Sequence, residues 1–307
     1  MNDLTLSRRQ VLAYSAACAA TLGAARLFAQ TLPLIQKTIP ASGETIVPVG
    51  IGTNRFGEGT DPKERAALLA TLKKFHELGG RLIDTAPVYG DSEAVLGGLI
   101  AELGIRGDLF LATKTDMGGR VKGKASYKQS CEKLKVDKAE LLQVHNLVNA
   151  REDLAALREL QTEGKVKYIG ITISQTSQFD AAENLLKQEK MDFIQLNYSL
   201  DDRLAAKRLL PLAQDKGLAV LVNLPFGRER LFKATNGKQL PDWAAEFDVQ
   251  SWGQFFLKYI IAHPAVTAAI PGTRREQHVV DNMGGARGRL PHADLRRRQE
   301  QFFDGLG

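Results

Sequence analysis

The chain has 307 residues, of which 44% are apolar and 25% are charged, and its formal net charge is +6. These values are ordinary for a globular protein with a large core, and the length suits one large domain such as a β/α barrel. No dense basic stripe accompanies the mild positive charge, so the composition predicts no nucleic-acid partner. The run Arg296–Arg298 is interpreted as a solvated helix face.

The first 29 residues differ in character from the rest of the chain. Arg8 and Arg9 precede an alanine-rich apolar run that reaches Phe28. This pattern resembles a twin-arginine export signal cleaved after Ala29, which implies a periplasmic protein and transient contact with the twin-arginine export machinery. The run is too short and too interrupted to predict a stable membrane span. Two alternatives stay open: lipid attachment at Cys18, and a cytoplasmic protein whose true start lies downstream.

Residues 30–307 are predicted to form the folded domain. Residues 1–29 carry three arginines and one aspartate, so the remainder has a formal charge of +4 and a single cysteine, Cys131. An intramolecular disulfide is then impossible, whichever compartment the protein occupies. This suits a protein that folds in the cytoplasm and is exported in the folded state.

The chain after residue 34 alternates between two kinds of segment. A β-hairpin is predicted from β-prone runs at 35–39 and 45–49 around Gly43, and short apolar runs then alternate with amphipathic helices. Residues 223 to about 248 are interpreted as a long loop. The predicted strands are 47–51, 81–83, 109–113, 140–144, 166–171, 192–196, 218–222 and 266–270, and the predicted helices are 62–78, 93–103, 127–134, 151–163, 175–187, 205–216, 250–262, 276–283 and 291–303.

Eight strand–helix alternations without a linker indicate parallel βαβ units closed into a (β/α)8 TIM barrel. The N-terminal β-hairpin precedes this α/β barrel, and the helix 291–303 is an extra C-terminal one. An open dinucleotide-binding sheet would need a glycine fingerprint after a strand. Gly57-Glu58-Gly59 lacks the third glycine, so that reading is rejected.

Polar side chains follow three neighbouring predicted strands. Asp84, Lys114 and His145 each stand at the carboxyl end of a strand, and Tyr89 lies in the loop after Asp84. Taken singly, each has an ordinary alternative: a turn residue, a surface lysine, a core histidine and an aromatic on the rim. Because a barrel brings the carboxyl ends of its strands to one mouth, their coincidence predicts an active site.

The chemistry of these four side chains is coherent. A phenol is a poor acid at neutral pH, and a nearby ammonium is expected to lower the pKa of Tyr89 while Asp84 holds Lys114 in place. Tyr89 then donates a proton to a carbonyl oxygen, and His145 hydrogen-bonds the same oxygen. No metal site is predicted, because no His, Cys or Asp cluster has ligand spacing.

The segments DTAPVYGDSE, LATK and LLQVHN, in this order, resemble those of the aldo-keto reductases, and the resemblance runs from about Ile35 to Phe303. It implies a (β/α)8 barrel that binds NADP(H) and reduces a small-molecule carbonyl substrate, or oxidises the alcohol. Tyr89 would be the proton donor or acceptor. It also implies cofactor contacts from Gly52, Thr53, Thr172, Gln195, Asn223, Leu224, Phe226, Gly272, Thr273, Arg274 and Asn282, with Arg274 suited to a 2′-phosphate.

Two positions depart from the family pattern. Thr172-Ile173 stands where the family often has Ser-Asn, and Asn223 stands where an aromatic residue commonly stacks on the nicotinamide. These departures motivate an alternative, an exported nucleotide-binding or regulatory barrel with little turnover. The substrate itself depends on the loops after Asn54, Gly118 and Pro225.

Overall fold

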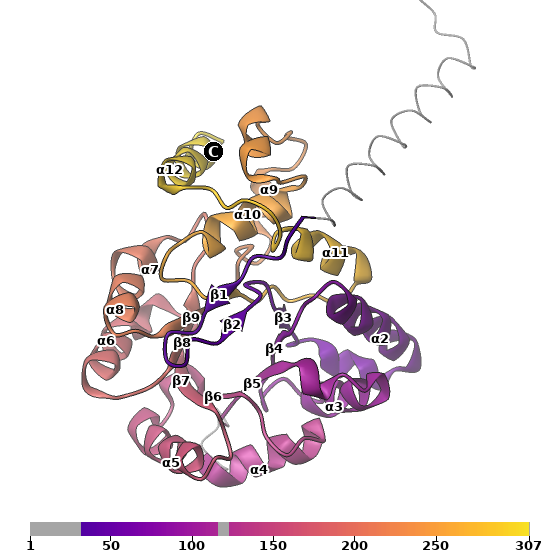
Figure 1. Cartoon of the computed structure of the whole chain (residues 1–307), viewed down its shortest axis with the longest axis vertical. Helices are drawn as coiled ribbons and strands as arrows, with labels where there is room; N and C mark the ends of the chain where they lie inside the picture. Colours follow the sequence, from indigo (N-terminus) through magenta and orange to yellow (C-terminus); the bar gives the residue numbers. More distant parts are fainter. Residues whose placement is uncertain (1–31, 116–122, 307) are drawn as a thin grey trace, which may run out of the picture.

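The computed structural model describes residues 32–115 and 123–306. Eight parallel strands form one sheet in which each strand pairs with its sequence neighbour (Figure 1). The prediction of an α/β fold with eight parallel strands is therefore confirmed. The strands are β3 (Ile51–Gly52), β4 (Leu82–Asp84), β5 (Phe110–Lys114), β6 (Leu141–Val144), β7 (Tyr168–Thr172), β8 (Phe193–Asn197), β9 (Ala219–Asn223) and β10 (Ala268–Ala269).

The two ends of this sheet are hydrogen-bonded to each other. The Gly50 amide donates to the Ala269 carbonyl at 2.9 Å, and the Ala269 amide donates to the Pro48 carbonyl at 2.9 Å. A further parallel bridge joins Gly52 to Gly272. These bonds satisfy backbone groups that an open edge would leave unpaired.

Helices surround the strands, and their apolar faces form the larger core cluster against the outer side of the sheet (Figure 1). α2 begins as its sequence predicts, because the Asp61 side chain accepts hydrogen bonds from two first-turn amides and Pro62 occupies the first position. The helices are α2 (Pro62–Glu77), α3 (Ser92–Leu103), α4 (Gly123–Leu134), α5 (Ala150–Thr162), α6 (Phe179–Gln188), α7 (Leu204–Lys207), α8 (Leu209–Asp215), α9 (Arg230–Ala234), α10 (Trp252–Ile261), α11 (Glu276–Gly284) and α12 (Ala293–Asp304).

Two predicted segments differ from the structure. The helix expected over 205–216 is broken at Arg208 into α7 and α8. Pro211 explains the break, since proline has no amide hydrogen and its ring clashes with the carbonyl four residues earlier, at Lys207. The loop expected over 223–248 contains α9 and the 3-10 helix η5 (Asp242–Phe247), which are too short for a clear apolar period.

An antiparallel pair, β1 (Lys37–Thr38) and β2 (Thr45–Ile46), precedes the barrel strands. Ile39 and Ile46 belong to a second core cluster with inward residues of the parallel strands, among them Leu82 and Phe193. The Tyr168 phenol donates to the Glu44 carboxylate at 2.7 Å and fastens the turn between β1 and β2. The hairpin therefore covers the apolar interior at the amino end of the strands, which leaves the carboxyl end for a cavity.

Across the described ranges, no helix combines the length and apolar character that a membrane crossing requires. The same residues contain no group of three or more His, Cys, Asp or Glu side chains arranged to hold a metal ion. The export signal assigned to residues 1–29 lies outside the described residues.

Candidate active site

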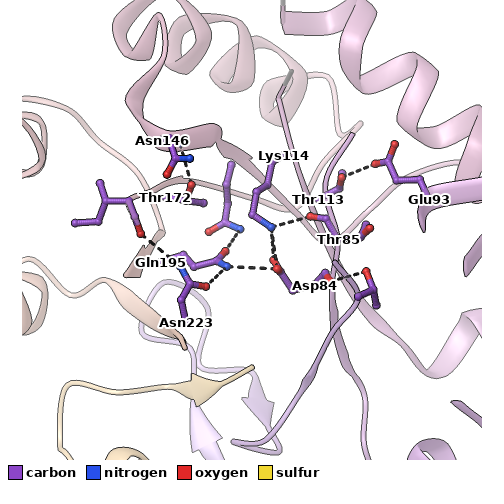
Figure 2. A network of polar contacts seen from close by, with 12 residues as sticks. Asp84, Thr85, Glu93, Thr113, Lys114, Asn146, Thr172, Gln195 and Asn223 are labelled. Carbon is purple, nitrogen blue, oxygen red and sulfur yellow. Dashed lines mark hydrogen bonds and ion pairs between the residues drawn. The ribbon is translucent and has the colours of Figure 1, made fainter. Parts of the chain in front are cut away.

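A buried ion pair joins the ends of β4 and β5. The Lys114 ammonium donates to both oxygens of Asp84, at 2.7 and 2.8 Å, and to the Thr85 carbonyl at 2.7 Å. Asp84 is 3% exposed and Lys114 is 1% exposed, so neither is a turn or surface residue. All three donor positions of the ammonium are directed at oxygens, which fixes the side chain in one place (Figure 2).

Tyr89 and His145 meet beside this pair. The Lys114 Nζ lies 5.4 Å from the centroid of the Tyr89 ring. The ring centroids of Tyr89 and His145 are 6.2 Å apart, and the two ring planes are nearly perpendicular, at 87°. His145 is buried and follows β6 directly, while Tyr89 is half-buried in the loop after β4. The four side chains predicted from strand ends thus form one group.

The ionisation of the group differs in one respect from the sequence-based expectation. Lys114 lowers the pKa of Tyr89, but burial and the Asp84 carboxylate together raise it by more, so the pKa lies above 10.0. The expected net lowering was wrong, because burial disfavours a phenolate and Asp84 repels it. Burial favours a neutral Lys114, yet Asp84 and Tyr89 outweigh it and raise the pKa of that ammonium. Tyr89 is therefore a protonated phenol at neutral pH beside a charged lysine.

A row of carboxamides crosses the barrel from the same ion pair. Gln143 donates to the Gln195 Oε1 at 2.6 Å. Gln195 in turn donates to the Asn223 Oδ1 at 2.6 Å and to Asp84 at 3.4 Å (Figure 2). Asn223, which stands where the resemblance led us to expect a stacking aromatic, is thus hydrogen-bonded to Gln195. Gln143 escaped the sequence analysis. It lies on β6 two residues before His145, which directly follows that strand, and the two-residue period of a strand would place both on the inner face.

A cavity of about 1020 Å³ opens at the carboxyl ends of the strands. Four of the side chains that line it are those of Asp84, Tyr89, Lys114 and His145. It also contains side chains that the sequence analysis did not single out, such as Ser174, Asn197 and Arg228. All the residues expected to contact a cofactor line it except Arg274, whose guanidinium instead pairs with Glu58. Those that line it are Gly52, Thr53, Thr172, Gln195, Asn223, Leu224, Phe226, Gly272, Thr273 and Asn282.

The cavity can accommodate a dinucleotide. Gly52 and Gly272 lie side by side on its wall, and a Cβ at Gly52 would come within 3.3 Å of the Ile270 carbonyl oxygen. Leu224 and Arg228 line it with left-handed backbones, φ 48° and 52°, a strained arrangement common where a loop holds a ligand. The lining therefore combines close-approach backbone, carboxamides and basic groups, which suits a nucleotide of this size.

Comparison with known proteins agrees with this geometry. The model of the Aldo/keto reductase family matches residues 48–300. The chain belongs to this family. The match contains every barrel strand and all four clustered side chains.

Individual members of the family resemble the chain over most of its length. Methylglyoxal reductase YeaE of Escherichia coli is 29% identical over 85% of this chain and 93% of its own. An NADH-specific methylglyoxal reductase of the same species is 29% identical over 59% of this chain and 64% of its own. A crystal structure of an aldo/keto reductase from Klebsiella pneumoniae in complex with NADP and acetate is 25% identical, with a TM-score of 0.73 over 88% of this chain and 96% of that one.

Proposed function

We propose that the chain is an NADP(H)-dependent oxidoreductase that reduces an aldehyde or ketone, or oxidises the corresponding alcohol. The observation that carries the proposal is the buried ion pair of Asp84 and Lys114 beside Tyr89 and His145 on one cavity wall. Relatives named as methylglyoxal reductases and a family structure complexed with NADP support it. The bound nicotinamide would supply or accept the hydride.

Each side chain has a distinct task in this reaction. Tyr89 donates the proton to the carbonyl oxygen, because its raised pKa keeps the phenol protonated at neutral pH. Lys114 stabilises the phenolate that this transfer leaves on Tyr89. The ion pair with Asp84 holds the lysine ammonium beside the Tyr89 ring. His145 lies at the edge of Tyr89 and directs the same oxygen by a hydrogen bond.

The cofactor contacts follow the cavity wall. Gln195 and Asn223 present carboxamides for the amide of the nicotinamide, and Gly52, Thr53, Gly272 and Thr273 offer backbone for close approach. Asn282, on α11, contributes to the cofactor site together with Thr273. Its amide donates to the Thr273 hydroxyl at 3.0 Å and holds the turn that carries Thr273 in place. A small carbonyl compound, of the class named for the methylglyoxal-reducing relatives, is the proposed substrate.

The test replaces Tyr89 by Phe. We expect kcat for carbonyl reduction to fall by about 10²- to 10⁴-fold, because the proton donor is lost while ring and packing remain. NADPH binding, followed by nucleotide fluorescence, should be unchanged. Tyr168→Phe is the matched control, since it removes a phenol at the opposite end of the barrel. Full activity in the Tyr89 variant would show that the phenol is not the donor.

A second candidate function is a nucleotide-binding or regulatory barrel with little turnover. It is favoured by Asn223, which is hydrogen-bonded to Gln195 and has no aromatic face for a nicotinamide ring. The same Tyr89→Phe variant separates the two candidates. A biological function that survives the change in cells cannot depend on catalysis by the phenol.

We further propose that residues 1–29 are a twin-arginine export signal and that residues 30–307 form one closed (β/α)8 barrel with an N-terminal hairpin and a C-terminal helix. Arg8 and Arg9 before an apolar run support export, and the bonds between the first and last strands support closure. The mature protein would be periplasmic. Cleavage of a reporter fusion after Ala29, lost in an Arg8→Lys/Arg9→Lys variant, tests export; an uncleaved cytoplasmic product would favour the alternative of a downstream start.

A further inference from the structure

Arg274 lies in the short segment between β10 and α11. Its backbone is held in place, since the Thr71 hydroxyl of α2 donates to its carbonyl at 3.0 Å. Its guanidinium does not line the cavity. It pairs instead with the Glu58 carboxylate and lies 3.6 Å from that of Glu64. The arginine best suited to a 2′-phosphate is therefore already occupied by carboxylates.

Glu58 is itself held from both sides. Its Oε1 accepts from Arg55 at 2.7 Å, while its Oε2 is bound to Arg274. The 3-10 helix η1 (Phe56–Thr60) that carries it is anchored to α3, because the Gly57 amide donates to the Ser92 hydroxyl at 2.9 Å. The carboxylate is thus presented to Arg274 by a fixed segment.

The charges of this cluster balance. Two guanidinium groups, of Arg55 and Arg274, face two carboxylates, of Glu58 and Glu64. Within these four groups a phosphate dianion that approaches Arg274 meets no net positive charge, and it competes with Glu58 for the guanidinium. The side chains are 24% exposed for Arg274 and 41% for Glu58, so solvent weakens the pair and the exchange is reversible.

We propose that Glu58 is a coenzyme-specificity residue, whose carboxylate competes with the 2′-phosphate of NADPH for Arg274. NADH has a hydroxyl in that position and does not compete. Glu58 therefore lowers the preference of the site for NADPH over NADH. The inference rests on the proposed function, because it requires that the cavity bind a nicotinamide dinucleotide.

The experiment measures the dissociation constants of NADPH and NADH by fluorescence titration of the purified protein and its Glu58→Gln variant. We expect the variant to bind NADPH about three- to tenfold more tightly, as the loss of one exposed competing carboxylate predicts. NADH affinity should change by less than about twofold, since no phosphate is gained. Equal effects on the two nucleotides, or none, would overturn the inference.

A control and a second variant separate this effect from general charge. Glu102→Gln removes a similarly exposed carboxylate, 45% against 41% for Glu58, that is bound to Arg65, and it should leave the ratio of the NADPH and NADH dissociation constants unchanged. Arg274→Gln should weaken NADPH binding by about tenfold. In the Arg274→Gln background, Glu58→Gln should not change the NADPH dissociation constant further. A persisting effect of Glu58→Gln there would contradict competition for Arg274. Absence of binding of both nucleotides to the unaltered protein would instead refute the proposed function itself.

Discussion

Among residues 32–115 and 123–306, two lysines are fully buried, and their surroundings differ. Lys114 is 1% exposed at the end of β5 and donates to the Asp84 carboxylate. Lys258 is 0% exposed in α10 and donates only to backbone carbonyls, of Phe247 at 2.7 Å, Arg287 at 2.6 Å and Arg289 at 3.0 Å. One ammonium is matched by a charge beside the cavity, and the other by dipoles inside the core.

Their pKa values shift in opposite directions as a result. Burial lowers the pKa of Lys258 to about 8, and the nearby Asp248 carboxylate and Arg289 guanidinium act on it in opposite senses. At Lys114 the same cost of burial is outweighed by Asp84 and Tyr89, and the pKa is raised. A carboxylate in contact thus keeps the pKa of a buried lysine high, and we propose that Tyr89 acts beside such a charged lysine. Lys258 joins the segments around Asp248 and Arg289 to α10 and serves stability.

The largest expected effect concerns activity. We expect Lys114→Met to lower kcat for carbonyl reduction by about 100- to 1,000-fold, because the phenolate left on Tyr89 loses its cation. The assay follows NADPH absorbance. Lys258→Met should keep kcat within about twofold at a temperature where it is folded, since Lys258 does not line the cavity.

A companion variant guards that comparison against simple misfolding. Lys114→Met alone leaves a buried carboxylate without its partner, which is strongly destabilising. Asp84→Asn/Lys114→Met removes both charges and should be folded and equally inactive. Equal loss of activity in the Lys258 and Lys114 variants would show that the two lysines do not divide into a catalytic and a structural one.

The second effect concerns stability. We expect Lys258→Met to lower the free energy of unfolding by about 2–4 kcal/mol, because one buried and two part-buried backbone carbonyls lose their donor. Urea denaturation measures it. Lys187→Met, on the exposed face of α6, is the control and should change the value by less than about 0.5 kcal/mol. A loss in the Lys258 variant as small as in this control would mean that its hydrogen bonds contribute little.

The smallest effect is a pH dependence. The pKa of Lys258 is about 8 in the folded protein and 10.5 ordinarily, so between these values the unfolded chain binds more protons. Raising the pH through this window favours the folded state, and the stability of the wild type relative to Lys258→Met should grow by about 1–2 kcal/mol from pH 8 to 9.5.

Lys114 supplies the contrasting case for the same titration. Because the pKa of Lys114 is raised in the folded protein, the stability that its charge contributes is fully present below pH 10.5. That stability is lost only as the pH rises through the pKa that Lys114 has in the folded protein. The wild type compared with Asp84→Asn/Lys114→Met should therefore show no gain between pH 8 and 9.5. A similar rise in relative stability in both comparisons would mean that groups other than Lys258 titrate in this pH range.

Much of the fold followed from local pattern. The alternation of apolar runs with amphipathic helices predicted each parallel strand, because period and length are properties of neighbouring residues. The break at Arg208 was also encoded locally, in Pro211, although it was overlooked. α9 could not be predicted in the same way, since its five residues depend on the burial of Leu231 in the surrounding protein.

The candidate site divides along the same line. The positions of Asp84, Lys114, Tyr89 and His145 at strand ends are sequence properties, and the parallel topology brings such ends together. The pairing of Arg274 with Glu58, more than 200 positions away, is not a property of the local sequence. It depends on which side chains the fold places around the guanidinium.

The sequence by itself thus determined the barrel class, the family and which four side chains gather at the carboxyl ends of the strands. Only the tertiary structure decided that Lys258 is buried rather than on a solvated helix face, that Tyr89 has a raised pKa, and that Arg274 is already paired. The reason is that a pKa or an ion pair depends on burial and on charges brought together from distant positions, and neither can be read from neighbouring residues alone.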